Sequence, residues 1–156
     1  MKHKNMTYPE SIEFLAKQAG LNPENGMIKD GNYIEKNYSS LKNLMNETNI
    51  FFQTQLKKSN VAKKYLDRRL IKNSIVEKFE LGYSGSSSNQ LYLHLKNKGL
   101  NLNDALSLGL IKKSNNREGE YYDFFRNRLI FPIKDYRSQV IAFGGRALDN
   151  SNIKYI

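Results

Sequence analysis

One long helical periodicity constrains this chain more than any other pattern in it. From about Tyr33 to Lys58, apolar side chains recur at steps of four and three, the spacing of one face of an α-helix. The residues on that face are Ile34, Tyr38, Leu41, Met45, Thr48, Phe52 and Leu56. A stripe of this kind is far more often core than ligand-binding surface. We therefore expect one long helix that packs against the rest of the molecule.

Shorter patterns predict further helices on both sides of this one. Thr7 and Glu10 have the spacing of a capping box, so a helix is expected over residues 8–19, followed by a linker over residues 22–32. Downstream helices are expected over 61–69, around 75–79, from 91 to 99 and over 102–108, with a loop over 84–89.

The pattern changes in the last third of the chain. Leu129–Ile133 and Gln139–Phe143 are short runs of strand-forming residues, and Asp135–Ser138 between them is a turn. Pro132 has no amide hydrogen, so its strand should be an edge strand or bulged at that point. The expected class is α+β, with a mostly helical first two-thirds followed by a β-hairpin or small antiparallel sheet.

Composition limits the partners and the chemistry. The 156 residues carry 25 Lys and Arg against 15 Asp and Glu, a net charge of +10. An excess of that size attracts polyanions such as nucleic acid, although a scattered excess only solvates a surface, and charge alone leaves both interpretations open. The chain has no cysteine, which excludes disulfides and thiolate zinc sites and is compatible with the cytosol. No apolar run approaches the roughly 18 residues of a membrane span, so no membrane partner is expected.

The residues themselves predict no catalytic group and no metal site. His3 and His94 are the two histidines, and we expect His94 to be a structural residue on a helix. Glu118, Glu120 and Asp123 form an acidic cluster that could bind Mg²⁺, but without a partner carboxylate on a second strand end we expect a solvated loop. The serines of the 84–88 loop lack a Gly-x-Ser-x-Gly elbow.

Basic and aromatic residues are interleaved near the end of the chain. They are Arg126, Arg128, Arg146, Lys154 and Tyr155. Arg146 follows the pair Gly144 and Gly145, where the absence of a Cβ lets a phosphate or base approach the backbone. Arginine offers a planar donor fork to phosphate, and tyrosine offers a face on which a base can stack. The combination suits a single-stranded nucleic-acid track. The alternative is that the glycines bend the strand tightly and Arg146 pairs with Asp149.

These residues also carry a resemblance to a known family. DFFRNRLIFPIKDYRSQVIAFGGRAL, Asp123–Leu148, resembles the central signature of bacterial DNA primases of the DnaG type. FELGY at 79–83 and LGLI at 108–111 resemble the segments that precede the signature in that family. TYPESIEFLAKQAG at 7–20 is similar to the stretch that joins its zinc-binding module to its polymerase core. The resemblance covers nearly the whole chain.

The resemblance implies that the chain is one part of a primase that makes RNA primers for DNA replication. Residues 1–26 would be a connecting arm from a zinc-binding module outside the chain. Residues 27–156 would be the N-terminal subdomain of the RNA polymerase core, cut before the Toprim domain. Toprim would hold Mg²⁺ or Mn²⁺ and the other module zinc, so this chain is expected to bind neither and to be inactive alone. The implied partners are single-stranded DNA template, RNA primer and, through other regions, the replicative helicase. A cytoplasmic monomer is expected.

The same resemblance assigns nucleic-acid-binding residues. Arg69, Arg146, Lys154 and Tyr155 match positions that face nucleic acid on a basic ridge, and Arg126 and Arg128 match a pair that binds there or supports the ridge. Four residues depart from the family pattern, namely Leu70, Ser138 and Ala142 in place of glycine and Ile153 in place of proline. The substitution at Leu70 could change the backbone turn after Arg69. The substitution at Ile153 could loosen the backbone that positions Lys154.

Two other interpretations stay open. The chain could be a stand-alone basic module that binds single-stranded nucleic acid without catalysis. It could also be a structural fragment that binds nothing, because its groove needs Toprim as the other wall. The structural fragment differs from the primase segment and the binding module in predicting no DNA binding.

Overall fold

The computed structural model describes residues 14, 15, 18, 31–114, 119–149 and 151–156, and side chains of the long helix from residue 38 onward. Contacts divide the chain into two units, Met1–Tyr38 and Ser39–Ile156, and the second contains the fold described below. The helix predicted over 8–19 lies outside the described residues except for Phe14, Leu15 and Gln18, which are helical. The predicted boundary between residues 26 and 27 also lies outside them.

The order of elements confirms the α+β class, with helices first and most strands last. Helix α2 (Gly31–Lys58) is the long helix expected from the periodicity. It is followed by α3 (Asn60–Arg68), α4 (Asn73–Lys78), β1 (Gly82–Tyr83), α5 (Gln90–Asn97), α6 (Leu102–Ser107), β2 (Ile111–Lys113), β3 (Tyr121–Asp123), β4 (Arg128–Lys134) and β5 (Val140–Ala147). The four short helices match those predicted, with small shifts at their ends. None of the helices in the described part of the chain is long and apolar enough to cross a membrane.

The strands form two antiparallel sheets. One has three strands in the order β1-β4-β5, and the other consists of β2 and β3. The predicted hairpin is β4 and β5, but β5 is longer than predicted and continues through the glycine pair to Ala147. Strand β1 and the β2–β3 pair were not predicted. At the far edge of β5, Arg146 bridges to Tyr155, and the amide of Gly145 donates to the carbonyl of Ile156 at 2.8 Å.

Pro132 lies in the central strand of the three-stranded sheet, so the prediction of an edge strand is wrong for β4 as a whole. The proline is tolerated because β1 pairs only with Leu129 and Ile130, which leaves β4 without a β1 partner at Pro132. The register also shifts just after it, between Ile133 and Lys134, as the predicted bulge requires.

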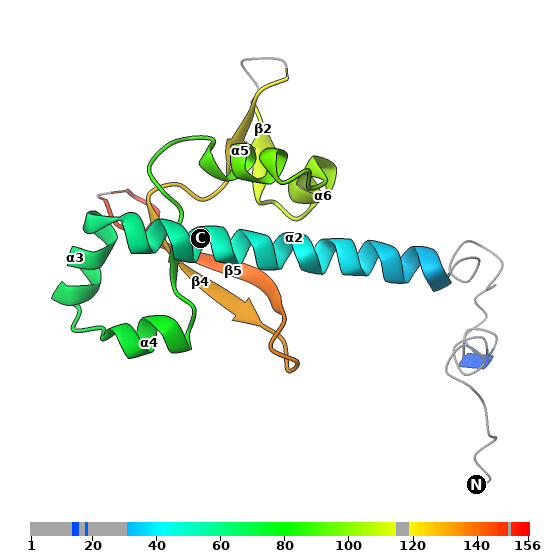
Figure 1. Cartoon of the computed structure of the whole chain (residues 1–156), viewed down its shortest axis with the longest axis horizontal. Helices are drawn as coiled ribbons and strands as arrows, with labels where there is room; N and C mark the ends of the chain where they lie inside the picture. Colours follow the sequence, from blue (N-terminus) through cyan, green and yellow to red (C-terminus); the bar gives the residue numbers. More distant parts are fainter. Residues whose placement is uncertain (1–13, 16–17, 19–30, 115–118, 150) are drawn as a thin grey trace, which may run out of the picture. The chain divides into compact units, whose positions relative to one another are not determined.

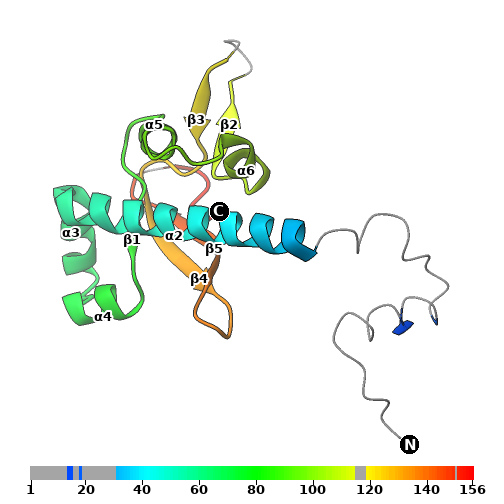
Figure 2. The same ribbon diagram turned by 45° about the vertical axis from the view of Figure 1, so that its right-hand side comes forward.

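Helix α2 is buried on a broader face than the predicted stripe. Met45, Thr48, Phe52 and Leu56 are buried as expected, and so are Leu44, Asn49 and Phe51, whereas Tyr38 is exposed. The reason is that α2 is covered from two directions. In both views, α5, α6, β2 and β3 lie on one side of it, and the β4–β5 hairpin lies on the other (Figures 1 and 2).

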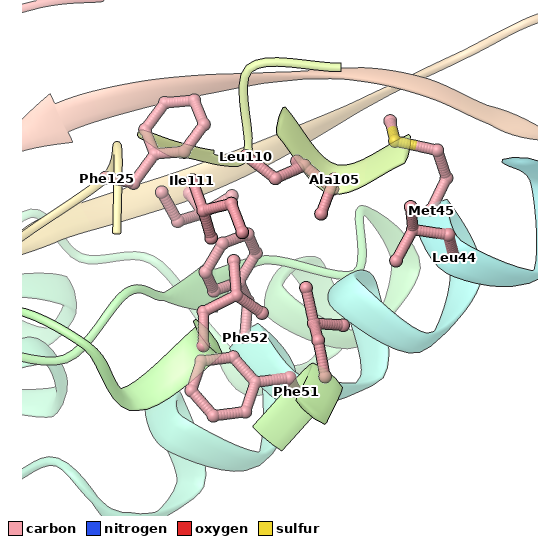
Figure 3. Close-up of a cluster of buried hydrophobic side chains, with 11 residues drawn as sticks. Leu44, Met45, Phe51, Phe52, Ala105, Leu110, Ile111 and Phe125 are labelled. Carbon is pink, nitrogen blue, oxygen red and sulfur yellow. The ribbon is translucent and has the colours of Figure 1, made fainter. Parts of the chain in front are cut away.

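Two hydrophobic clusters hold these layers together. The larger one joins α2, α5, α6, β2 and β4, and Figure 3 shows Phe52, Ile111 and Phe125 among the side chains that meet there. The smaller one, which we call the α3 cluster, consists of Leu56, Ala62, Leu66, Leu81, Tyr83 and Leu129. Gly82 brings β1 close to α2, since a Cβ at that position would lie 2.5 Å from the Cβ of Phe52.

Candidate nucleic-acid interface

Arg69 is positioned by the way helix α3 ends. The amide of Ile71 donates to the carbonyl of Leu66 at 3.0 Å, and that of Leu70 donates to Asp67 at 2.9 Å, which is the Schellman pattern. The pattern places Leu70 in the left-handed region, with φ of 57°. The backbone thus makes a left-handed turn after Arg69 with leucine in place of glycine, at the strain that a side chain imposes. Arg69 is the C-cap residue of α3 and is exposed.

Two predicted site residues, Arg69 and Arg146, contact the ring of Tyr65, and a third, Tyr155, contacts Arg146. The guanidinium carbon of Arg146 lies 4.8 Å from the ring centroid of Tyr65, and that of Arg69 lies 5.6 Å from it. Arg146 is also 5.6 Å from the ring of Tyr155, and its Nε donates to the Tyr155 hydroxyl at 3.0 Å. We call these four residues, Tyr65, Arg69, Arg146 and Tyr155, the Tyr65 cluster.

Arg128 supports the segment that carries Lys154 and Tyr155. Its Nη1 donates to the carbonyl of Ile153 at 3.0 Å and to that of Lys154 at 3.3 Å. The amide of Ala147 also donates to the carbonyl of Lys154, at 2.8 Å. Backbone bonds therefore fix the segment although isoleucine stands in place of proline at 153. Lys154 directly precedes Tyr155 in the sequence, and its side chain is exposed.

Arg126 makes a different contact. Its guanidinium lies 5.5 Å from the ring of Tyr122 on β3, and the side chain is exposed. The structure thus brings Arg69, Arg146 and Tyr155 together and links Arg128 to Lys154. Among the contacts of the described residues, Arg126 joins neither group.

Asp149 does not hold Arg146, so the alternative explanation of that arginine is not what the structure shows. Asp149 instead accepts from Nδ2 of Asn127 at 2.7 Å and from the amide of Ser151 at 3.0 Å. The hydrogen bond from Asn127, and then that from Ser151, hold the pKa of Asp149 below its ordinary value. The glycine pair lies within β5, and a Cβ on Gly145 would meet Phe125 at 2.7 Å. Gly145 is therefore explained by close packing and not by a tight bend.

Asp123 corrects the prediction of a solvated acidic loop. It is only 1% exposed and accepts from the amides of Leu91 at 2.8 Å and Tyr92 at 2.9 Å, so it caps helix α5 from strand β3. Burial raises its pKa to about 6, against the opposing effect of these hydrogen bonds. Glu118 lies outside the described residues, and Glu120 is exposed. Among the residues that the structure describes, no group of three His, Cys, Asp or Glu side chains is placed to hold a metal ion.

His94 has the structural role expected of it. Its Nε2 lies 2.9 Å from Oε1 of Glu47, and its ring lies 4.9 Å from that of Phe51. The imidazole therefore joins α5 to α2.

Tyr65 is the residue that the site prediction lacked. It precedes Arg69 by four positions on the predicted helix, the spacing at which two side chains meet on a helix surface. That spacing was a usable signal for Arg69, whereas the contact with Arg146 depends on the pairing of distant segments.

Comparison with known proteins places this geometry in a family. The sequence profile of the DNA primase catalytic core, N-terminal domain, matches residues 51–156, which is more than half of the chain. The chain belongs to this primase family. The family predicted from the signature at 123–148 is thereby confirmed.

Curated relatives extend the match over the full chain. The DNA primase of Clostridium acetobutylicum is 36% identical over 159 residues, covering 100% of this chain and 26% of the relative. The DNA primase of Haemophilus influenzae is 34% identical over 163 residues, covering 100% of this chain and 27% of the relative. The chain thus spans about a quarter of the length of these primases.

Solved primase structures share the fold. A DnaG primase catalytic domain bound to single-stranded DNA superposes with a TM-score of 0.68 at 31% identity, covering 76% of this chain and 38% of that one. The RNA polymerase domain of the Mycobacterium tuberculosis primase, in complex with a double-stranded DNA oligomer with a 6-nucleotide overhang, gives 0.68 at 27% identity, with coverage of 76% and 37%. The zinc-binding and RNA polymerase domains of the Aquifex aeolicus primase give 0.70 at 30% identity, with coverage of 97% and 35%.

Proposed function

We propose that this chain is the segment of a DNA primase that guides single-stranded DNA template and RNA primer toward the metal-bearing Toprim domain, which lies outside it. The guiding surface is a basic ridge formed by Arg69, Arg146, Lys154 and Tyr155, with Arg128 as support and Arg126 as an outlying cation. The observation that carries the proposal is the Tyr65 cluster, where two guanidinium groups gather at one ring.

The chemistry of the Tyr65 cluster fits a single strand. Arginine forks bind phosphate in a bidentate manner, and a net charge of +10 draws a polyanion toward the surface. The ring of Tyr155 is 66% exposed and offers a face for an unpaired base. The structure of a related catalytic domain with bound single-stranded DNA supports the same class of ligand.

Primer synthesis itself requires parts beyond this chain. The described residues do not fit a metal site, since their one fully buried carboxylate, Asp123, caps a helix. In this proposal Mg²⁺ or Mn²⁺ belongs to Toprim, zinc belongs to the N-terminal module, and the replicative helicase binds elsewhere. The chain alone would be an inactive monomer in the cytoplasm.

The proposal predicts salt-dependent DNA binding that depends on the ridge. The double variant Arg146→Ala/Lys154→Ala should bind fluorescently labelled single-stranded DNA at least tenfold more weakly in an anisotropy titration. Two lost phosphate contacts should also reduce the slope of log K against log salt by about 1.4. The matched control is Lys96→Ala/Lys113→Ala, which removes two exposed charges from α5 and β2. The control should keep nearly wild-type affinity.

Other outcomes select the rival interpretations. Equal losses in both double variants would mean that net charge alone attracts DNA, and the ridge assignment would be wrong. No binding by the wild-type chain would favour a structural fragment. A stand-alone binding module predicts the same DNA titration, but it differs from a primase segment in whether a chimera can synthesise primers. Joined to the remainder of the Clostridium acetobutylicum primase, a true primase segment should restore primer synthesis, whereas a binding module should not.

A further inference from the structure

Tyr65 contacts two arginines of the proposed ridge, although its own side chain is uncharged. Its ring is the shared contact of Arg69, which comes from the end of α3, and of Arg146, which comes from β5. These two arginines are far apart in the sequence and belong to different elements. A single aromatic side chain thus contacts two charged groups from separate elements.

The ring is itself held in place by the core. Tyr65 is partly buried and packs against the α3 cluster, on the same helix as the buried Ala62 and Leu66. The helix is anchored at its start by Ser59, whose hydroxyl accepts from the amide of Ala62 at 3.2 Å. A fixed ring can therefore restrict two long side chains that would otherwise sample many rotamers, each at an entropic cost on binding.

The contacts leave the arginines able to bind a ligand. Arg146 uses Nε for its hydrogen bond to Tyr155, and this bond does not occupy the terminal Nη groups that grip a phosphate. The negative face of an aromatic ring also offsets the mutual repulsion of two nearby cations. We propose that Tyr65 is a positioning residue, whose ring holds the guanidinium groups of Arg69 and Arg146 ready for the phosphates of a single strand. This inference rests on the proposed function.

Two substitutions at Tyr65 separate the ring from the hydroxyl. Tyr65→Phe keeps the ring and should bind labelled single-stranded DNA within twofold of the wild type. Tyr65→Leu keeps an apolar side chain against the α3 cluster but removes the ring face. It should weaken binding about five- to thirtyfold, the loss expected for two cation–π contacts. Urea unfolding of both variants shows that each is folded at the temperature of the titration.

A merely structural role for Tyr65 gives a different result. In the Arg69→Ala/Arg146→Ala background, Tyr65→Leu should cause no further loss of affinity, because the groups that the ring positions are gone. A further loss in that background, or an unchanged affinity of Tyr65→Leu in the wild-type background, overturns the inference. An equal loss in Tyr65→Phe and Tyr65→Leu overturns it as well, since the hydroxyl would then be the active group.

A measurement without DNA separates this inference from the proposed function. The side-chain proton signals of Arg146 should be shifted upfield by the ring in NMR spectra of the wild type and Tyr65→Phe, and this shift should be reduced in Tyr65→Leu. Absence of the change overturns the positioning role whatever the DNA result. A wild-type chain that shows the shift but binds no DNA rejects the proposed function, and with it a role for Tyr65 in binding phosphates.

Discussion

Leu70 is 88% exposed and has φ of 57°, a conformation in which an L side chain is strained and glycine is not. The conformation is imposed by the Schellman pattern at the end of α3, which fixes the backbone beside Arg69. The strain at Leu70 is thus the cost of the turn that positions Arg69, and it can be measured.

Replacing Leu70 with glycine should stabilise the chain. Relief of the left-handed strain is worth about 1 kcal/mol, partly offset by the greater freedom of glycine in the unfolded chain. Urea unfolding should therefore show a higher midpoint for Leu70→Gly than for the wild type. The control Lys63→Gly lies inside α3, where glycine costs up to about 1 kcal/mol, and should lower the midpoint. A lower midpoint for Leu70→Gly would contradict the strain.

The adjacent glycines of β5 should respond very differently to alanine. A Cβ on Gly145 would lie 2.7 Å from Cδ1 of Phe125 and 3.1 Å from Cδ of Arg128, so Gly145→Ala should cost about 1–3 kcal/mol of unfolding free energy. A Cβ on Gly144 has the carbonyl oxygen of Ile156 at 3.9 Å as its nearest neighbour, an ordinary contact. Gly144→Ala is therefore the matched control and should be nearly neutral in thermal unfolding. Equal losses would refute the packing explanation.

At the level of elements, helix α5 is capped from outside itself. Its N-cap residue Asn89 makes no side-chain capping hydrogen bond, and Asp123 of β3 accepts from the first-turn amides instead. A carboxylate at a helix N-terminus is favoured by the helix dipole, but this one is buried, and burial prevails in raising its pKa to about 6.

This cap predicts a pH dependence with a definite sign. Between the ordinary carboxyl pKa of about 4 and the raised value of about 6, the folded chain binds more protons at Asp123 than the unfolded chain. The contribution of Asp123 to stability therefore falls as pH rises through this window and levels off above it, by at most about 3 kcal/mol. Urea unfolding between pH 4 and pH 8 should show this fall in the wild type relative to Asp123→Asn.

The comparison with Asp123→Asn isolates that residue from other carboxylates. The hydrogen bond from Lys134 lowers the pKa of Glu80, which contributes stability that is lost as pH falls. That opposite trend is common to both proteins and cancels in their difference. A constant difference between wild type and variant across the window would mean that Asp123 has an unshifted pKa.

The sequence predicted the elements whose own residues form a periodic pattern, and it missed those that depend on distant partners. The stripe around Met45 and Phe52 predicted α2, and the two short apolar runs on either side of the turn at Asp135 predicted the hairpin. Strand β1 has two residues and exists only because Gly82 fits against Phe52 and pairs with Ile130. A feature so short and so dependent on distant partners leaves no periodic signal.

Across the whole molecule, the residues of the candidate site could be predicted from the sequence, whereas their arrangement in space could not. The interleaved basic and aromatic residues pointed to Arg146, Lys154 and Tyr155, and the resemblance to the family added Arg69. The meeting of Arg69 with Arg146 at Tyr65 depends on packing between α3 and β5, which neither segment specifies alone. The sequence therefore named Arg69 and Arg146 as candidate site residues but did not predict that both contact the ring of Tyr65.

The three-stranded sheet pairs two strands that are separated by a long segment of the chain. Strand β1 pairs with β4, and helices α5 and α6 together with the β2–β3 sheet lie between them along the chain. Pairing Gly82 with Ile130 requires closure of a long loop, whose entropic cost must be met before the contact is gained. Helices α2 and α3 follow one another along the chain, so the contacts between them in the α3 cluster are local. We therefore expect folding to be limited by the joining of β1 to β4, with the Tyr65 cluster formed last, when β5 and the segment around Tyr155 pack against α3.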